Sequence, residues 1–181
     1  MKDLKEFTIP FVGLKLGKHQ FNFELNNSFF EHFEYEEFND VDINLDVQLE
    51  KQTTLLEFTL SYNGTVNVAC DITNELFDLD LSGDYHFVVK FGEAYNDENE
   101  DLLILPHGSY EVSIQQYIYE SIVLAMPSRR IHPGIADGTL KSDILDKLEE
   151  LSPKAPNEET QPEANKTDPR WDSLKKLLTD K

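Results

Sequence analysis

The stretch SIQQYIYESIVLAMPSRRIHP, Ser113–Pro133, divides the chain into a region patterned as β-strands and a region patterned as a tether. Its apolar residues recur at helical spacing: Ile114, Tyr117, Ile118, Ile122 and Ala125. Ser113 and Gln116 have the spacing of a capping box, and Pro127 ends the pattern. Three more apolar residues widen the arc, so we expect a central core helix buried on more than one side: Val123, Leu124 and Met126.

Alternation of apolar and polar residues before this helix predicts an antiparallel sheet. The clearest segment is DINLDVQLE at residues 42–50. Turn signals at Asn63-Gly64, Thr73-Asn74 and Gly83 separate further alternating segments. We therefore expect an α+β fold in which an antiparallel meander, or half-barrel, packs on the central helix. A capping box at Ser28 and Glu31 predicts a short helix over residues 29–38, and residues 92–101 are expected to form an acidic loop.

The C-terminal part of the chain changes character twice. Apolar residues at 144, 145, 148 and 151 predict an amphipathic helix over residues 142–151, which closes an acidic α+β domain at 1–151. Residues 152–167 hold three prolines and no large apolar side chain, which indicates a disordered linker. Residues 168–181 contain DPRWDSLKKLL, which predicts a short amphipathic helix. This helix docks either on its own domain or on a partner.

The net charge of −19 belongs to the first 151 residues, because residues 152–181 hold six basic and six acidic side chains. Residues 24–50 alone hold nine acidic side chains and no lysine or arginine. Such a surface repels phosphate backbones and attracts basic partners. The alternative is that the acidity only aids solubility.

Cysteine content and hydropathy indicate a cytoplasmic protein. The single cysteine, Cys70, cannot form an intramolecular disulfide, which fits a reducing compartment. The first ten residues, MKDLKEFTIP, lack the apolar run of a signal peptide. No segment approaches the roughly 18 consecutive apolar residues of a membrane span.

No catalytic or metal-binding pattern stands out. The five histidines are scattered, and zinc needs about four clustered nitrogen or sulfur ligands. Cys70 alternates with Val66 and Val68, so a buried, inert thiol is expected. No glycine-rich phosphate loop is present. We therefore expect no enzyme activity, no cofactor, no metal and no small-molecule substrate.

Two groups of residues are candidates for contact with a partner. Arg129, Arg130 and His132 form the one basic cluster at the end of an element; they either complement the helix dipole or contact an anion or RNA. Arg170, Trp171 and Leu174 lie in the predicted C-terminal helix, which carries the only tryptophan.

Three segments, taken in order, resemble the YceD family, the large ribosomal RNA subunit accumulation proteins. They are GTVNVACDITNELFDLDLSGDYHFVVKF, EVSIQQYIYESIVLAMPSRRIHPG and DPRWDSLKKLL. The R-x-I-H-P and D-P-R-W variants resemble the branch found in Bacteroidetes-type bacteria. The family's first cysteine matches Cys70, but its second falls at Thr73 and a later one is absent, so the resemblance implies no metal here.

The resemblance implies a non-enzymatic ribosome-biogenesis factor. Its acidic domain would bind a basic ribosomal protein or a large-subunit precursor, and through these partners it could contact ribosomal RNA indirectly; direct contact with RNA is left open. The alternative is an acidic adaptor or nucleic-acid mimic that occupies a basic cleft of another protein. A ligand-binding half-barrel or enzyme is a third possibility.

Overall fold

The structure is a computed structural model that describes residues 4–152. The chain divides between Lys141 and Ser142 into two compact units. This division falls inside the domain expected over residues 1–151. Apart from Ser152, the linker expected over 152–167 and the helix expected over 168–181 lie outside the described residues.

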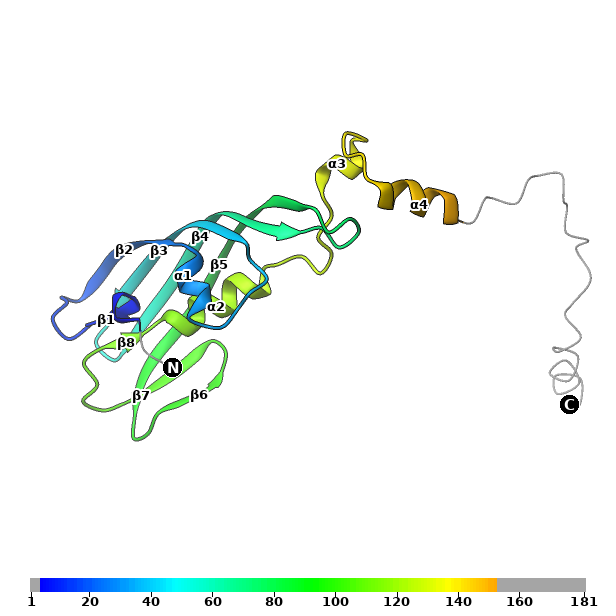
Figure 1. Ribbon diagram of the computed structural model, residues 1–181. Helices are drawn as coiled ribbons and strands as arrows, with labels where there is room; N and C mark the ends of the chain where they lie inside the picture. The colour runs from blue at the N-terminus through cyan, green and yellow to red at the C-terminus, as the bar shows by residue number, and fades with distance from the viewer. Residues whose placement is uncertain (1–3, 153–181) are drawn as a thin grey trace, which may run out of the picture. The chain divides into compact units, whose positions relative to one another are not determined.

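A six-stranded sheet forms the first unit, in the order β2-β3-β4-β5-β7-β6 (Figure 1). The first four are antiparallel neighbours in chain order, so the expected meander and α+β class are confirmed. β7 runs parallel to β5, and a small sheet joins β1 to β8. The strands are β1 Thr8–Ile9, β2 Gly17–Leu25, β3 Asp40–Lys51, β4 Leu55–Ala69, β5 Leu76–Gly92, β6 Asn96–Asn99, β7 Leu102–Pro106 and β8 Val112–Ser113.

Two of the three expected turns are wrong. Asn63-Gly64 lies inside β4 and Gly83 inside β5, so two long strands replace several short ones. At Gly64 the glycine allows close approach of strands, since a Cβ there would lie 2.1 Å from the Asp42 carbonyl oxygen. The turn at Thr73-Asn74 is confirmed: Asn74 has φ 59°, and its N–H donates to the Cys70 carbonyl at 2.8 Å.

The first helix and the central helix do not begin at the serines that the capping patterns predicted. Asn26 caps the first helix, because its side chain accepts from the Ser28 N–H at 3.1 Å, and that helix is shorter than expected. Ser113 pairs with Thr8 in β8 and is not a cap. Part of the expected acidic loop is β6. The helices of this unit are η1 Lys5–Phe7, α1 Asn27–Glu31, α2 Gln115–Leu124 and α3 Pro133–Ala136.

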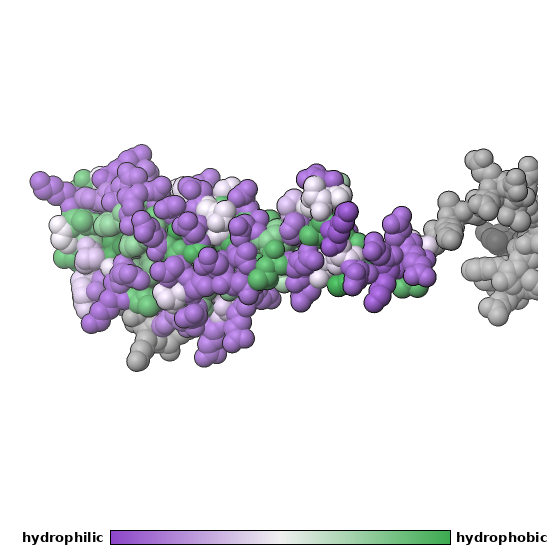
Figure 2. All heavy atoms as spheres, turned by 45° about the horizontal axis from the view of Figure 1, so that its top comes forward, coloured by the Kyte–Doolittle hydropathy of each residue, from purple (hydrophilic) through white to green (hydrophobic). Residues whose placement is uncertain are grey.

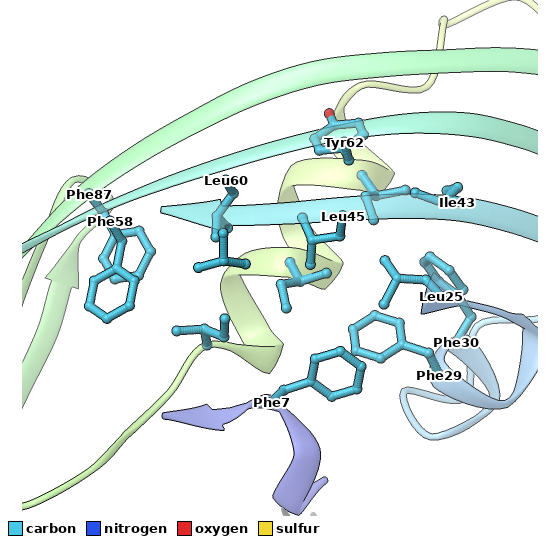
Figure 3. Close-up of a cluster of buried hydrophobic side chains, with 14 of the residues drawn as sticks. Phe7, Leu25, Phe29, Phe30, Ile43, Leu45, Phe58, Leu60, Tyr62 and Phe87 are labelled. Carbon is cyan, nitrogen blue, oxygen red and sulfur yellow. The ribbon is translucent and has the colours of Figure 1, made fainter. Parts of the chain in front are cut away.

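The core lies between the inner face of the sheet and α2, α1 and the N-terminal segment (Figure 3). Ile118 and Ile122 of α2, and Ile114 at its N-terminal cap, are fully buried, which confirms the expected core helix. Phe58 and Phe87 stack below the arching strands with ring centroids 4.9 Å apart. Leu124 is 82% exposed, so the expectation that it widens the buried arc was wrong.

In the second unit, α4 runs from Asp143 to Leu151, as the sequence predicted. Ser142 caps it by accepting from the Ile144 N–H at 3.4 Å. Its apolar residues are on one side, yet none of them is buried. None of the helices in the described part of the chain has the length and hydrophobicity needed to cross a membrane.

Candidate functional site

Seven carboxylates occupy one end of the outer face of the sheet, which we call the acidic sheet face. Four cross-strand rows form it: Asp40–Asn67–Asp78, Asp42–Thr65–Asp80, Glu24–Asn44–Asn63–Ser82 and Asn22–Asp46–Ser61–Asp84. The remaining side chains in these rows are Asn, Ser and Thr, so the rows contain no cation. The carboxylates therefore face solvent without a basic neighbour in the rows, and together they create a negative electrostatic potential over this face.

This face follows from simple alternation in the strands. Inward positions of β3 are apolar and buried, while outward positions are polar, so the pleat separates core from charge. Neutral Asn, Ser or Thr side chains lie between many of the carboxylates, and Asn67 Nδ2 donates to Asp78 Oδ1 at 2.6 Å. Figure 2 shows one view of the surface, in which hydrophilic residues predominate and hydrophobic residues form small separate groups.

The predicted basic cluster separates into one arginine that is anchored by ion pairs and one that has no ion pair within the described residues. Arg130 Nη1 lies 2.8 Å from Glu37 Oε2, and its Nε lies 3.3 Å from Asp71 Oδ1. The Arg130 backbone N–H also donates to Asp71 Oδ2 at 2.6 Å. Arg129 is exposed and makes no ion pair with any residue in 4–152. Arg130 therefore fastens the segment after α2 to the β4–β5 turn.

His132 lies beside the buried thiol of Cys70. The His132 backbone N–H donates to Cys70 Sγ at 3.4 Å, and its Nδ1 accepts from the Gly134 N–H at 2.9 Å. The His132 ring also lies 5.4 Å from the ring of Phe77. The imidazole thus caps the N-terminus of α3 and packs on Phe77 of β5, so contacts within the first unit fix the position of the ring.

Cys70 is 2% exposed, which confirms the expected burial. Burial raises the pKa of its thiol, but donors around the sulfur outweigh this effect and lower the pKa to about 7. The donors are the Thr73 side chain and the backbone amides of His132, Thr73 and Ile72. The turn that contains Thr73 therefore favours a thiolate.

Among residues 4–152, no group of three or more His, Cys, Asp or Glu side chains is arranged to hold a metal. Arg170, Trp171 and Leu174 lie outside the described residues, so their role stays a prediction. Sequence reasoning missed Glu37 and Asp71 as partners of Arg130, because both lie far from it in the chain.

A protein-family model described as "Large ribosomal RNA subunit accumulation protein YceD" matches residues 58–178. The matched region begins in β4 and includes the Cys70 turn, α2 and the Arg129–His132 cluster. Neither a curated protein nor a solved structure matches the chain.

Proposed function

Because the chain belongs to the YceD family of large ribosomal RNA subunit accumulation proteins, we propose that it supports accumulation of that RNA by binding a basic partner. The partner is a basic ribosomal protein or a large-subunit precursor that contains one. The protein acts in the cytoplasm as a binding factor and catalyses no reaction. The acidic sheet face is the observation that carries the proposal.

The acidic sheet face suits a basic protein better than RNA. Its seven carboxylates would repel phosphate groups, whereas lysine and arginine side chains would gain from each of them. An acidic surface that binds a basic protein also screens that protein from RNA, because both would compete for the same lysine and arginine side chains. Exposed ion pairs each contribute little, so the affinity should come from many of them and should fall with salt.

Arg129 and the C-terminal segment are proposed as further contacts. Arg129 is exposed and lacks a carboxylate partner within residues 4–152, so its guanidinium is available to an anionic group. Arg130 and His132 are held by their own domain, and we assign them the task of presenting Arg129. Arg170, Trp171 and Leu174 would add an aromatic and apolar contact, since tryptophan and arginine often dominate interfaces.

Sucrose-gradient sedimentation of cell lysate tests the proposal. The tagged full-length protein should sediment with large-subunit precursors at low salt and leave those fractions as salt rises. The variant Asp42→Asn/Asp80→Asn removes two carboxylates that flank Thr65 in one row, and it should sediment less with the precursors. The control, Glu93→Gln/Glu111→Gln, removes the same charge at exposed sites outside the rows and should behave as the native protein.

Three outcomes would count against the proposal. Sedimentation only with free protein fractions would contradict binding to precursors. Recovery of one non-ribosomal protein with a basic cleft, through the same acidic sheet face, would favour the adaptor or nucleic-acid mimic. Truncation after Leu151, or Trp171→Ala, should also reduce co-sedimentation, and normal sedimentation of both would remove the C-terminal segment from the interface.

A further inference from the structure

A groove of about 730 Å³ runs along the exposed side of α2. Asp84 and Tyr85 of β5 line one wall, and α2 lines the other from Tyr117 onward. Residues 97–100, from β6 and the turn after it, close the groove at one side. A smaller hollow of about 250 Å³ adjoins it and shares Asp97, Tyr117 and Glu120, so the depression extends toward the start of α2.

The walls of the groove combine tyrosine rings with carboxylates. The rings are those of Tyr62, Tyr85, Tyr117 and Tyr119, and the acidic residues are Asp84, Asp97, Glu98, Glu100 and Glu120. No lysine, arginine or histidine lines either hollow. Burial raises the pKa of Tyr85, and Asp101, Glu120 and Glu100 raise it further, which shows how concentrated the negative field is there.

The tyrosine walls are held in place by the core. Tyr117 stacks on Phe87 with centroids 4.1 Å apart, and on Tyr85 at 6.2 Å. Tyr62 donates from its hydroxyl to the Ser121 carbonyl oxygen at 2.9 Å. Because these rings are already fixed, a bound segment would order few of them, which lowers the entropic cost of binding.

Two further features suit an extended peptide. At one end of the groove Leu124 is 82% exposed, which offers an apolar contact on a helix whose other side is core. β5 pairs with β4 from Leu76 to Lys90 but with β7 only from Val88, so within the described residues no strand covers its second edge at Asp84 and Tyr85. That edge leaves backbone groups open to the groove.

We infer that this groove binds a lysine- and arginine-rich segment of the basic protein partner, interleaved with apolar residues. The cationic groups would meet the acidic rim, and their alkyl stems or guanidinium planes would lie on the tyrosine faces. An apolar residue of the segment would contact Leu124. The inference rests on the proposed function, because it adds to the acidic sheet face a second contact with the same basic partner. RNA is the wrong ligand here, since the rim would repel its phosphates.

Fluorescence anisotropy of a labelled peptide of alternating arginine and leucine tests this assignment on the full-length chain. The groove variant Glu98→Gln/Glu120→Gln removes two carboxylates that line the groove and lie outside the acidic sheet face. It should weaken binding on the order of fivefold, the factor expected for loss of two partly exposed ion pairs. Leu124→Ser should weaken it as well without changing its salt dependence. The matched control, Glu93→Gln/Glu111→Gln, removes the same charge at exposed sites outside both the groove and the acidic sheet face, and it should change the affinity by less than about twofold.

Three results would overturn the assignment. Equal losses in the groove and control variants would show that net charge alone attracts the peptide. Equal binding of a second peptide, in which glutamate replaces every arginine, would show that the charge of the peptide plays no part in binding. The peptide should also shift the ring NMR signals of the four tyrosines, whereas shifts confined to β3 residues would place it elsewhere.

The test separates this inference from the proposed function. If the groove variant still sediments with large-subunit precursors as the native protein does, the groove is not the recognition site and the proposed function stands. If the peptide binds in the groove but the protein never sediments with precursors, the groove assignment stands and the proposed function fails.

Discussion

Gly83 lies directly opposite Tyr62 on the neighbouring strand, and the tyrosine ring fills the space that a side chain at Gly83 would need. A Cβ at Gly83 would lie 2.5 Å from Tyr62 Oη and 2.8 Å from Cζ. Tyr62 is 5% exposed and bonded to Ser121 of α2, so it cannot move away without breaking the link between sheet and helix.

Gly83→Ala should therefore destabilise the fold by about 1–3 kcal/mol, the usual range for overpacking a well-filled core. Urea unfolding measures this loss. Gly13→Ala is the matched control, because nothing lies within 4 Å of its Cβ position, and it should stay within about 0.5 kcal/mol of the native value. Similar losses in both variants would mean that Tyr62 does not set the space at Gly83.

Ile118 and Leu124 test the two sides of α2. Ile118 is fully buried, so Ile118→Ala should cost about 2–5 kcal/mol in the free energy of unfolding. Leu124→Ala lies on the same helix but at an 82% exposed position, and it should change stability by less than about 0.5 kcal/mol. Urea or thermal unfolding separates the two variants. A small loss from Ile118→Ala would show that α2 is peripheral to the core.

The sequence was sufficient where one local rule decided the outcome. Alternation over residues 42–50 predicted β3 and its buried side, and the apolar spacing predicted α2. It failed at Asn63-Gly64, because a dipeptide typical of hairpin turns serves here to let β3 and β4 approach closely. That role depends on the neighbouring strand and cannot be read from local residues.

Gly64→Ala follows from this difference and should be the most damaging glycine substitution in the sheet. Its Cβ would lie 2.1 Å from the Asp42 carbonyl oxygen and 2.6 Å from Ile43 Cα, which are backbone atoms that cannot rotate away. We expect a loss of about 3 kcal/mol or more, larger than for Gly83→Ala. If Asn63-Gly64 were a turn, alanine there would cost much less, so unfolding curves of the two variants decide the point.

The pKa of Cys70 predicts a pH dependence of stability. The fold lowers this pKa from its ordinary 9.0 to about 7, so the folded state favours the thiolate. The resulting stabilisation is complete above the unfolded-state pKa and is lost as pH falls through the folded-state pKa. The free energy of unfolding of the native protein, relative to Cys70→Ser, should therefore rise between pH 7 and 9. A difference that stays constant with pH would contradict the lowered pKa.

The candidate site was partly predictable for a similar reason. The spacing of Arg129, Arg130 and His132 marked a basic cluster, but the carboxylates that bind Arg130 come from α1–β3 and β4–β5 connections far away in the chain. Only the fold shows which arginine is paired. The groove beside α2 was also missed, since its tyrosines and carboxylates come from four separate elements, β4, β5, β6 and α2.

Substitution of Arg130 should therefore lower stability, whereas substitution of Arg129 should affect only binding to the partner. Arg130→Ala removes two partly exposed ion pairs that fasten the segment after α2, and should cost on the order of 1 kcal/mol, or about 2–4 °C in melting temperature. Arg129→Ala removes no ion pair within residues 4–152 and should leave the melting temperature unchanged. If Arg129 contacts the partner, its loss should still weaken co-sedimentation with precursors.

The same two variants distinguish a structural cluster from a binding cluster. Glu37→Gln supplies the control for Arg130, because it breaks one of the same ion pairs from the other side and should reproduce part of the loss in melting temperature. It should leave binding as it is, since Arg129 stays in place. Equal melting temperatures for Arg129→Ala and Arg130→Ala would show that the ion pairs with Glu37 and Asp71 contribute nothing. Normal co-sedimentation of Arg129→Ala would remove this arginine from the interface, and binding would then have to come from the other proposed contacts, above all the acidic sheet face.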